Sequence, residues 1–266
     1  MSLLHIVVLA LVQGVFEFLP ISSSAHLVLV SKLGGFPDQG PLVDLALHLA
    51  TLCSILVCLW PEVRRAFRGL WLALRGRFHE PDAKLALLLI LASVPGLAAG
   101  LGLYLMGGEG AHMRSLKVIA VGMAVFAVAL YVADKFFPED KEIKDLGWGG
   151  ALIIGLSQAC AFIPGASRSG VTTTAGRFLG LTRTESIRFS LLLSIPLILA
   201  AGAAGTGELA MEADAAFLRD ALIAAFLTFL VGCATIKLLL RYLQKADMTV
   251  FVIYRLLLAG FLFAVA

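Results

Sequence analysis

The sequence has few charged residues. Asp, Glu, Lys and Arg together make up 15% of the 266 residues, whereas apolar residues make up 60%. Soluble domains carry charges at roughly 25% of their positions, so this composition excludes an ordinary soluble protein. We therefore expect an integral membrane protein.

The chain also lacks the patterns that bind zinc or form a disulfide framework. Its cysteines, Cys53, Cys58, Cys160 and Cys233, lie in apolar runs without C-x-x-C or Cys/His spacing, and we interpret them as small buried residues. The formal net charge is only +3, which gives no support for nucleic-acid binding. The first dozen residues contain no Lys or Arg, unlike the start of a signal peptide, and we expect them to be retained.

Apolar runs that are long enough to cross a bilayer recur along the whole chain. A spanning helix needs roughly 20 apolar residues. We predict such helices at about residues 41–60, 85–105, 116–134, 187–204, 219–240 and 249–266. No separate soluble domain is left, so we expect residues 1–266 to form a single membrane domain.

Two further apolar segments, about 1–35 and 148–180, are interrupted. In each, an apolar run meets a proline, Pro20 or Pro164, and a serine-rich stretch then leads into a second run of about fifteen residues. Fifteen helical residues cover only about 22 Å, which is too short to cross the membrane. We therefore predict an all-α membrane protein with six transmembrane helices and two re-entrant helical hairpins.

The distribution of Lys and Arg among the loops predicts how the chain is oriented in the membrane. Lys and Arg concentrate in the connections 61–84, 135–147 and 241–248, whereas the alternating connections are poor in them. Because positively charged loops stay in the cytoplasm, we expect these three loops there and both termini outside. The first hairpin then enters from the outside and the second from the cytoplasm.

This order of segments contains an inverted repeat. A hairpin and three spans in 1–134 are followed by a hairpin and three spans in 148–266, and the odd number of spans turns the second unit over. The stretches FLPISSSAH (18–26) and FIPGASRSG (162–170) align, with Ser23 over Ser167. Broken helices of inverted repeats often meet at the midplane and form a polar site there.

The first break carries a carboxylate. Gln13 and Glu17 are four residues apart, so both project from one face of a helix. Pro20 should end that helix, because proline lacks an N–H group and disfavours helical geometry at Leu19, the residue before it.

A serine cluster and a histidine follow this proline. Ser22, Ser23 and Ser24 are suited to cap a second short helix, and His26 falls within its first turn. The free N–H groups and the positive dipole end of a helix start favour an anion. The first break is therefore predicted to form one wall of an anion-binding pocket.

The second break carries an arginine. In PGASRSG, Gly165 allows an unusual backbone turn, and Ser167, Arg168 and Ser169 follow. A guanidinium inside the membrane costs about 2.5–3.5 kcal/mol, so we expect an anionic partner, and its planar fork suits phosphate oxygens. The alternative is a purely structural ion pair between Glu17 and Arg168. The other histidines, His5, His48, His79 and His112, lack polar company, and we interpret them as interfacial, packed or loop residues.

These stretches resemble the two signature motifs of the bacterial undecaprenyl-diphosphate phosphatases of the BacA/UppP family. Gln13 to Glu17 with the following ISSSAH is similar to the family's (Glu/Gln)-x-x-x-Glu motif and its continuation, and PGASRSG is similar to PGxSRSG. DLALHLATL (44–52) and RFSLLLSIP (188–196) also look like that family. Gln13 stands where many members have Glu, so Glu17 is the only intramembrane carboxylate of the motif.

The resemblance implies an enzyme that hydrolyses undecaprenyl diphosphate to undecaprenyl phosphate and inorganic phosphate with a divalent cation, Mg or Ca. It implies a multi-pass protein of the bacterial inner membrane whose site opens to the periplasm, and roles in recycling the lipid carrier of peptidoglycan synthesis and in bacitracin resistance. The partners would be the polyprenyl diphosphate lipid and the bilayer, and a homodimer stays an open alternative for the assembly.

For this reaction we expect Arg168 to bind the diphosphate, aided by Ser167, Ser169 and backbone amides, with Glu17 as a partial metal ligand. His26 either accepts a proton or attacks phosphorus, and Ser23 is a rival nucleophile. Two other classes fit the same features. One is a transporter or lipid flippase that holds a phosphate headgroup at Arg168, and the other is a phosphatase for different lipid diphosphates.

Overall fold

All regular structure is helical in the part of the chain that the computed structural model describes, residues 1–37, 39–106, 115–212 and 215–266. Within these ranges no strand is present, and the only bridge joins Lys141 to Leu181. The predicted all-α class is therefore confirmed. His112, predicted to be an interfacial, packed or loop residue, lies outside the described ranges.

Among the described residues, five helices are long and apolar enough to cross a membrane. They are α3 (Pro41–Cys58), α5 (Pro81–Leu105), α6 (Leu116–Phe136), α9 (Arg183–Glu212) and α10 (Ala215–Leu243), and they match the first five predicted spans. The last predicted span is α11 (Thr249–Val265), which has only 17 residues. At 1.5 Å per residue it covers about 26 Å, slightly less than the hydrocarbon layer.

Both segments that were predicted to be interrupted contain a break. The first consists of α1 (Leu3–Phe16) and α2 (Ser23–Gly34), and the second consists of α7 (Trp148–Ala159), the 3-10 turn η3 (Cys160–Phe162) and α8 (Arg168–Phe178). Helix α1 ends at Phe16, before Leu19, so Leu19 is not helical, as predicted from Pro20. The carbonyls of Leu19 and Pro20 instead accept hydrogen bonds from side chains of other helices.

The turns that lead into α2 and α8 place serines in an unusual conformation. Ser22 and Ser167 have φ angles of 111° and 71°, and Gly165 has 82°. Ser167 caps α8 by accepting a hydrogen bond from the Gly170 N–H at 3.2 Å, whereas Ser22 makes no such bond. Ser22 and Ser167 are thus the equivalent residues directly before the two helices, so the alignment of Ser23 with Ser167 is shifted by one position.

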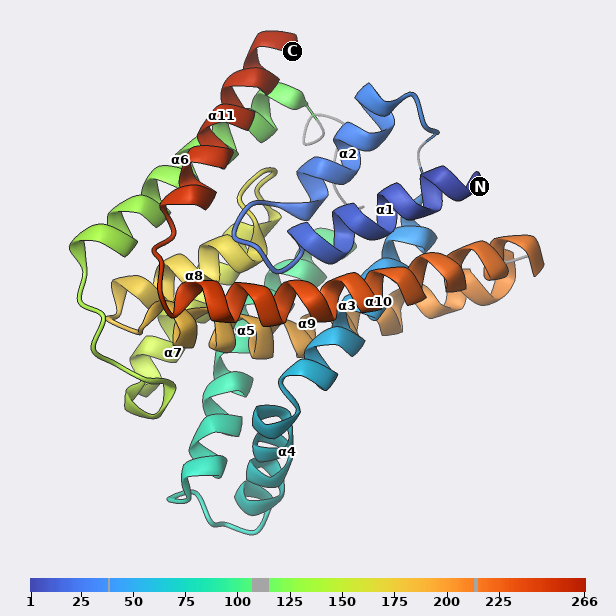
Figure 1. Cartoon of the computed structure of the whole chain (residues 1–266). Coiled ribbons are helices and arrows are strands. Elements are labelled where there is room, and N and C mark those ends of the chain that lie inside the picture. The colour runs from blue at the N-terminus through green and yellow to red at the C-terminus, as the bar shows by residue number, and fades with distance from the viewer. Residues whose placement is uncertain (38, 107–114, 213–214) are drawn as a thin grey trace.

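One helix was not predicted. The arginine-rich connection 61–84 contains α4 (Trp60–Leu74), which packs against the first turns of α5. Figure 1 shows this pair at the bottom of the view, apart from the other helices. The positive charge of this region had suggested a loop, but its apolar residues recur at helical spacing.

Glycines allow the short helices to approach the long ones closely. Helix α1 packs against α10 and α7 packs against α5, while α6 and α11 run side by side (Figure 1). A Cβ atom on Gly14 of α1 would lie 2.8 Å from Val231 Cβ, and one on Gly155 of α7 would lie 2.5 Å from the Ala92 carbonyl oxygen. Small residues at such contacts are a common way to pack helices in membranes.

A buried arginine of α11 joins the two breaks. Arg255 is fully buried. Its Nη1 donates to the Pro20 carbonyl at 3.0 Å, and its Nη2 donates to the Gly165 and Ala166 carbonyls, each at 3.0 Å. Its Nε donates to the Met123 carbonyl of α6 at 3.3 Å. One guanidinium therefore holds both turns and α6 together. The chain's cysteines are all free thiols, but the interpretation that they are buried is wrong: Cys53 is exposed, and Cys58, Cys160 and Cys233 are partly exposed.

Replacing Arg255 by Lys should destabilise the protein. One ammonium nitrogen cannot reach carbonyls on both turns and on α6, and each buried carbonyl that loses its donor costs about 1–3 kcal/mol. The melting temperature in detergent, followed by circular dichroism, should fall clearly for Arg255→Lys. Arg241→Lys, at an exposed position near the end of α10, is the matched control and should melt like the unmodified protein. Equal melting temperatures of both variants would show that the two turns do not need the hydrogen bonds of Arg255.

Replacing Gly155 by Ala should separate α7 from α5. The new methyl group would collide with the backbone of Ala92, which cannot move without shifting a whole helix, and overpacking of this kind costs about 1–3 kcal/mol. Gly149→Ala in the same helix is the control, because a Cβ there meets nothing within 4 Å. Thermal melting should therefore distinguish the two variants, and a Gly155→Ala protein as stable as Gly149→Ala would contradict the close contact.

Candidate active site

The two breaks meet at one end of a cavity of about 690 Å³. The polar end is lined by residues of both breaks and by one histidine of α3: Glu17, Ser22, Ser23, Ser24, His48, Ser167, Arg168 and Ser169. The rest of the wall is mostly apolar and comes from α3, α5 and α9, with Leu45, Leu97, Leu101, Leu197 and Ile198 among its residues. Such a cavity suits a ligand with a charged head and an apolar chain.

A carboxylate and a guanidinium form the centre of the polar end. Arg168 Nη2 lies 2.6 Å from Glu17 Oε1, and their side chains are only 12% and 7% exposed. Arg168 Nη1 also approaches the Ser190 carbonyl of α9 at 3.4 Å. The predicted anionic partner of Arg168 is therefore Glu17. Because Arg168 is the first residue of α8, its charge adds to the positive end of that helix dipole.

Two further side chains hold the carboxylate in place. Ser23 Oγ donates to Glu17 Oε2 at 2.7 Å, and Gln13 Nε2 donates to the same oxygen at 3.2 Å. Gln13 lies one helical turn before Glu17 and is fully buried, so it does not line the cavity. Glu17 thus accepts from one neutral amide and one hydroxyl while it pairs with Arg168.

The serines of the two breaks are linked to one another. Ser169 Oγ donates to the Leu19 carbonyl of the first break at 2.9 Å. Within each break, Ser167 and Ser169 are 3.2 Å apart and Ser22 and Ser24 are 3.3 Å apart, measured between hydroxyl oxygens. Hydroxyls and the first N–H groups of α2 and α8 therefore gather at the polar end, as an anion site requires.

His26 is not brought to this cavity. Its Nδ1 lies 2.7 Å from the Ser22 carbonyl, which can only accept, so Nδ1 carries a proton. Its Nε2 lies 2.7 Å from the hydroxyl of Tyr254, and its ring stacks on Phe16 at 3.8 Å between ring centroids. Both ring nitrogens have partners behind the break, and the predicted grip of His26 on the same ligand as Arg168 is not seen.

His48 is the histidine that lines the cavity instead. Its Nε2 lies 3.6 Å from Glu17 Oε2, and its Nδ1 lies 2.7 Å from the Asp44 carbonyl. The sequence interpretation had treated His48 as a packed or interfacial residue. The available signal was its place in DLALHLATL (44–52), a stretch that resembles the family but has no polar cluster of its own.

Gly165 also lies behind the cavity. It does not line the cavity, and a Cβ on it would lie 2.2 Å from the Ile119 carbonyl oxygen. Its positive φ and this close contact both require glycine, so Gly165 shapes the turn and presents its carbonyl to Arg255. Arg255 itself was not found from the sequence, because it is a lone charge in an apolar run.

The described residues contain no group of three or more His, Cys, Asp or Glu side chains that could hold a metal ion. Near Arg168, the donors are the Glu17 carboxylate, the Ser23 hydroxyl and the His48 imidazole. Mg²⁺ is commonly bound through one or two carboxylates together with phosphates of the substrate. These residues therefore fit a divalent cation only if a phosphate ligand supplies further oxygens.

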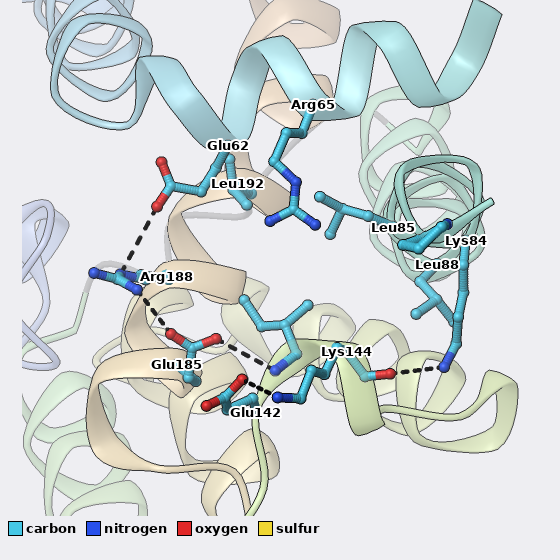
Figure 2. A pocket seen from close by; sticks show the side chains of 12 residues that line it. Glu62, Arg65, Lys84, Leu85, Leu88, Glu142, Lys144, Glu185, Arg188 and Leu192 are labelled. Atoms are coloured by element: carbon cyan, nitrogen blue, oxygen red, sulfur yellow. Dashed lines mark hydrogen bonds and ion pairs between the residues drawn. The ribbon is translucent and has the colours of Figure 1, made fainter. Parts of the chain in front are cut away.

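A second cavity, of about 190 Å³, lies among charged residues of α4, α5, α9 and the turn η2 (Ile143–Asp145) (Figure 2). Its charges are paired with one another: Lys144 with Glu142 at 2.8 Å and Arg188 with Glu185 at 2.9 Å. Lys84 donates to the Lys144 carbonyl at 2.8 Å. Arg188 of α9 also lies 4.0 Å from Glu62 of α4, and Glu185 accepts from the Ile143 N–H at 3.3 Å. We therefore interpret these residues as an ion-pair network that ties the helices together, and not as the active site.

Comparison with known proteins assigns the family. A family model described as bacitracin resistance protein BacA matches residues 6–261. An undecaprenyl-diphosphatase of Ruegeria pomeroyi is 42% identical over 266 residues, covering 100% of this chain and 99% of the relative. Undecaprenyl-diphosphatases of Jannaschia sp. and Teredinibacter turnerae are 44% and 43% identical, with at least 99% of every chain covered. Because both the model and these relatives match nearly the whole length, the chain belongs to the BacA family.

Proposed function

We propose that this chain hydrolyses undecaprenyl diphosphate to undecaprenyl phosphate and inorganic phosphate. The observation that carries this proposal is the cavity in which Arg168 and two helix starts form one end and apolar side chains form the rest. A diphosphate attached to a long polyprenyl chain needs both parts of such a cavity. The relatives are named undecaprenyl-diphosphatase, and the function fits recycling of the lipid carrier for peptidoglycan and resistance to bacitracin.

Arg168 is the phosphate-binding group in this proposal. A guanidinium fork matches two phosphate oxygens, and the hydroxyls of Ser22, Ser24, Ser167 and Ser169 add donors around it. Positive charge and oriented donors that face the developing charge are the main source of catalysis in phosphoryl transfer. The starts of α2 and α8 contribute in the same direction, because both lie at the polar end of the cavity and the N-terminus of a helix favours an anion.

Ser23 is the nucleophile that the contacts favour. Its hydroxyl already donates to Glu17 at 2.7 Å. Glu17 would take the proton as Ser23 Oγ bonds to the terminal phosphorus and undecaprenyl phosphate leaves. In the second step water attacks the phosphorus of the phosphoserine, Glu17 returns its proton to Ser23 Oγ as the P–O bond breaks, and the proton lost by the water leaves with the inorganic phosphate. His26 acts as a positioning residue in this scheme, since it holds the Ser22 carbonyl at the start of α2.

Glu17 would also be the protein's ligand for a divalent cation, Mg or Ca, with the substrate oxygens completing the set. When bound, the cation would neutralise part of the diphosphate charge. Gln13 supplies an amide where a second carboxylate would stand, so this chain offers one carboxylate to the ion.

We propose an inverted repeat of 1–134 and 148–266, with α11 as the sixth span and the two broken segments as re-entrant hairpins. The packing pattern supports it: exchanging the halves turns the α1–α10 pair into the α7–α5 pair, and both pairs are observed. The lysines and arginines of 61–84, 135–147 and 241–248 support a cytoplasmic side there, with the cavity open to the periplasm across the inner membrane. A homodimer stays a prediction.

Purified protein in detergent should release phosphate from undecaprenyl diphosphate without any ion or voltage gradient. Arg168→Lys should lower kcat/KM by at least roughly 100-fold, because a point charge cannot replace the fork, while Arg241→Lys should retain full activity. If neither the unmodified protein nor Arg241→Lys released phosphate, the flippase or transporter alternative would be favoured. A panel of shorter lipid diphosphates would distinguish this enzyme from phosphatases that act on other lipid diphosphates. Near-normal turnover of Arg168→Lys would remove Arg168 from the site.

Glu17→Gln should reduce turnover and shift the metal requirement. The amide keeps the shape of the side chain, but it cannot accept a proton from Ser23 and binds divalent cations poorly. Activity titrated with Mg²⁺ should therefore have a lower maximum and a midpoint at a higher concentration. His5→Gln changes a buried residue at the end of α1 that is opposite to Glu17, and it serves as a control. An unchanged midpoint would show that Glu17 is not a metal ligand.

A further inference from the structure

Helix α4 has two different apolar faces. Its inner face packs against α5 and contains the buried residues Val63, Gly69, Leu72 and Ala73. The contact is tight, because a Cβ on Gly69 would lie 1.8 Å from the Asp82 carbonyl oxygen. This face explains why α4 folds onto α5, but it leaves the other apolar residues of the helix without a role.

The outer face is an exposed apolar stripe, here called the α4 stripe: Trp60, Phe67, Leu70, Trp71 and Leu74. At 3.6 residues per turn these positions fall on the side of the helix opposite Gly69. Their exposed fractions run from 39% for Leu70 to 75% for Leu74. The stripe stays exposed, and α4 stands beside the start of α5, away from the other helices (Figure 1).

Three exposed arginines border the α4 stripe: Arg64, Arg68 and Arg75. Arg75 lies over the Trp71 ring, with its guanidinium carbon 4.3 Å from the ring centroid. Arg68 is within 3.6 Å of Asp82 in the first turn of α5. Because the apolar run of α5 begins at Leu85, directly after Lys84, Asp82 marks the level at which the helix leaves the hydrocarbon layer. Arg68 therefore lies beside the polar start of α5, where the headgroups of a bilayer are expected.

We propose that α4 is a binding surface for anionic phospholipids. The α4 stripe enters the leaflet, and Arg64, Arg68 and Arg75 bind the headgroup phosphates. Aromatic side chains prefer the membrane interface, and arginines keep their charge at the headgroups while their stems lie along apolar surface. Each basic residue near an anionic surface adds attraction, and guanidinium–phosphate bonds are strong ones.

The charges disfavour a second copy of the chain as the occupant. A two-fold interface sets the same patch of both copies against itself. The arginines of one copy would then face those of the other, and like charges repel. Lipid phosphates, in contrast, bring the opposite charge.

The test uses the chain's own tryptophans. It has three, and Trp148→Phe removes the one outside α4, so that fluorescence then reports only Trp60 and Trp71. The protein is placed in nanodiscs of phosphatidylcholine and phosphatidylglycerol, with bromine on the acyl chains of one lipid or the other at equal fraction. Brominated phosphatidylglycerol should quench roughly twofold or more strongly than brominated phosphatidylcholine.

The preference should depend on the arginines. In the Trp148→Phe background, Arg64→Gln, Arg68→Gln and Arg75→Gln together should bring the ratio to about one, whereas Arg241→Gln should leave it unchanged. In the protein that keeps all its arginines, high salt should lower the ratio of quenching by brominated phosphatidylglycerol to quenching by brominated phosphatidylcholine. This measurement does not require the arginine variants to fold. Equal quenching by the two lipids would overturn the proposal, and so would the absence of quenching by either, since a second copy or water would then cover the stripe.

Discussion

The site depends on one contact between segments that lie about 150 residues apart in the chain, the ion pair of Glu17 and Arg168. Either charge alone would be costly inside a membrane, where insertion of an arginine or an aspartate at mid-depth costs about 2.5–3.5 kcal/mol. At 2.6 Å each charge offsets part of the cost of the other. The pair therefore requires both breaks to be present and to meet. It also keeps a guanidinium at the polar end of a cavity whose other walls are apolar.

The breaks themselves are possible only because other side chains take over the hydrogen bonds of the interrupted helices. Irregular backbone at membrane depth is tolerated where protein covers it. Arg255 provides three of these hydrogen bonds, to Pro20, Gly165 and Ala166, and a fourth to Met123 of α6. Ser169 provides one more, to Leu19. Arg168 and Arg255 thus have different roles. Arg168 faces the cavity, while Arg255 lies behind the turns and adds positive charge near the same place, which favours a multiply charged anion.

The sequence predicted the parts of the site that are marked by a local pattern. Proline next to serine-rich stretches located both breaks, and the scarcity of charge in the apolar runs made Glu17 and Arg168 obvious partners. It did not predict Arg255 or His48, because a lone polar residue in an apolar run does not reveal which face of its helix is buried. The surroundings of His26 could not be predicted for a similar reason. Its position in the first turn of α2 is as predicted, but the direction of its ring depends on Tyr254, which is 228 residues away.

Helix α9 links the candidate active site to the ion-pair network of Figure 2. Arg188 lies in that network, the Ser190 carbonyl approaches Arg168, and Leu197 and Ile198 line the apolar part of the cavity. The polar end therefore lies within about one helical turn of the charged layer formed by α4, α5, α9 and η2. Single exposed ion pairs contribute little, about 0–1 kcal/mol, whereas a network that includes several helices holds them jointly.

A hydrolase needs access for its lipid from one side only, and a charged layer that closes the other side is compatible with that requirement. A transporter would have to open this layer in every cycle, breaking the contacts that join its elements. These are Arg188 with Glu62 at 4.0 Å, Lys84 with the Lys144 carbonyl at 2.8 Å and the Ile143 N–H with Glu185 at 3.3 Å. The arrangement of charges along α9 thus favours hydrolysis over translocation on physical grounds that are independent of the family assignment.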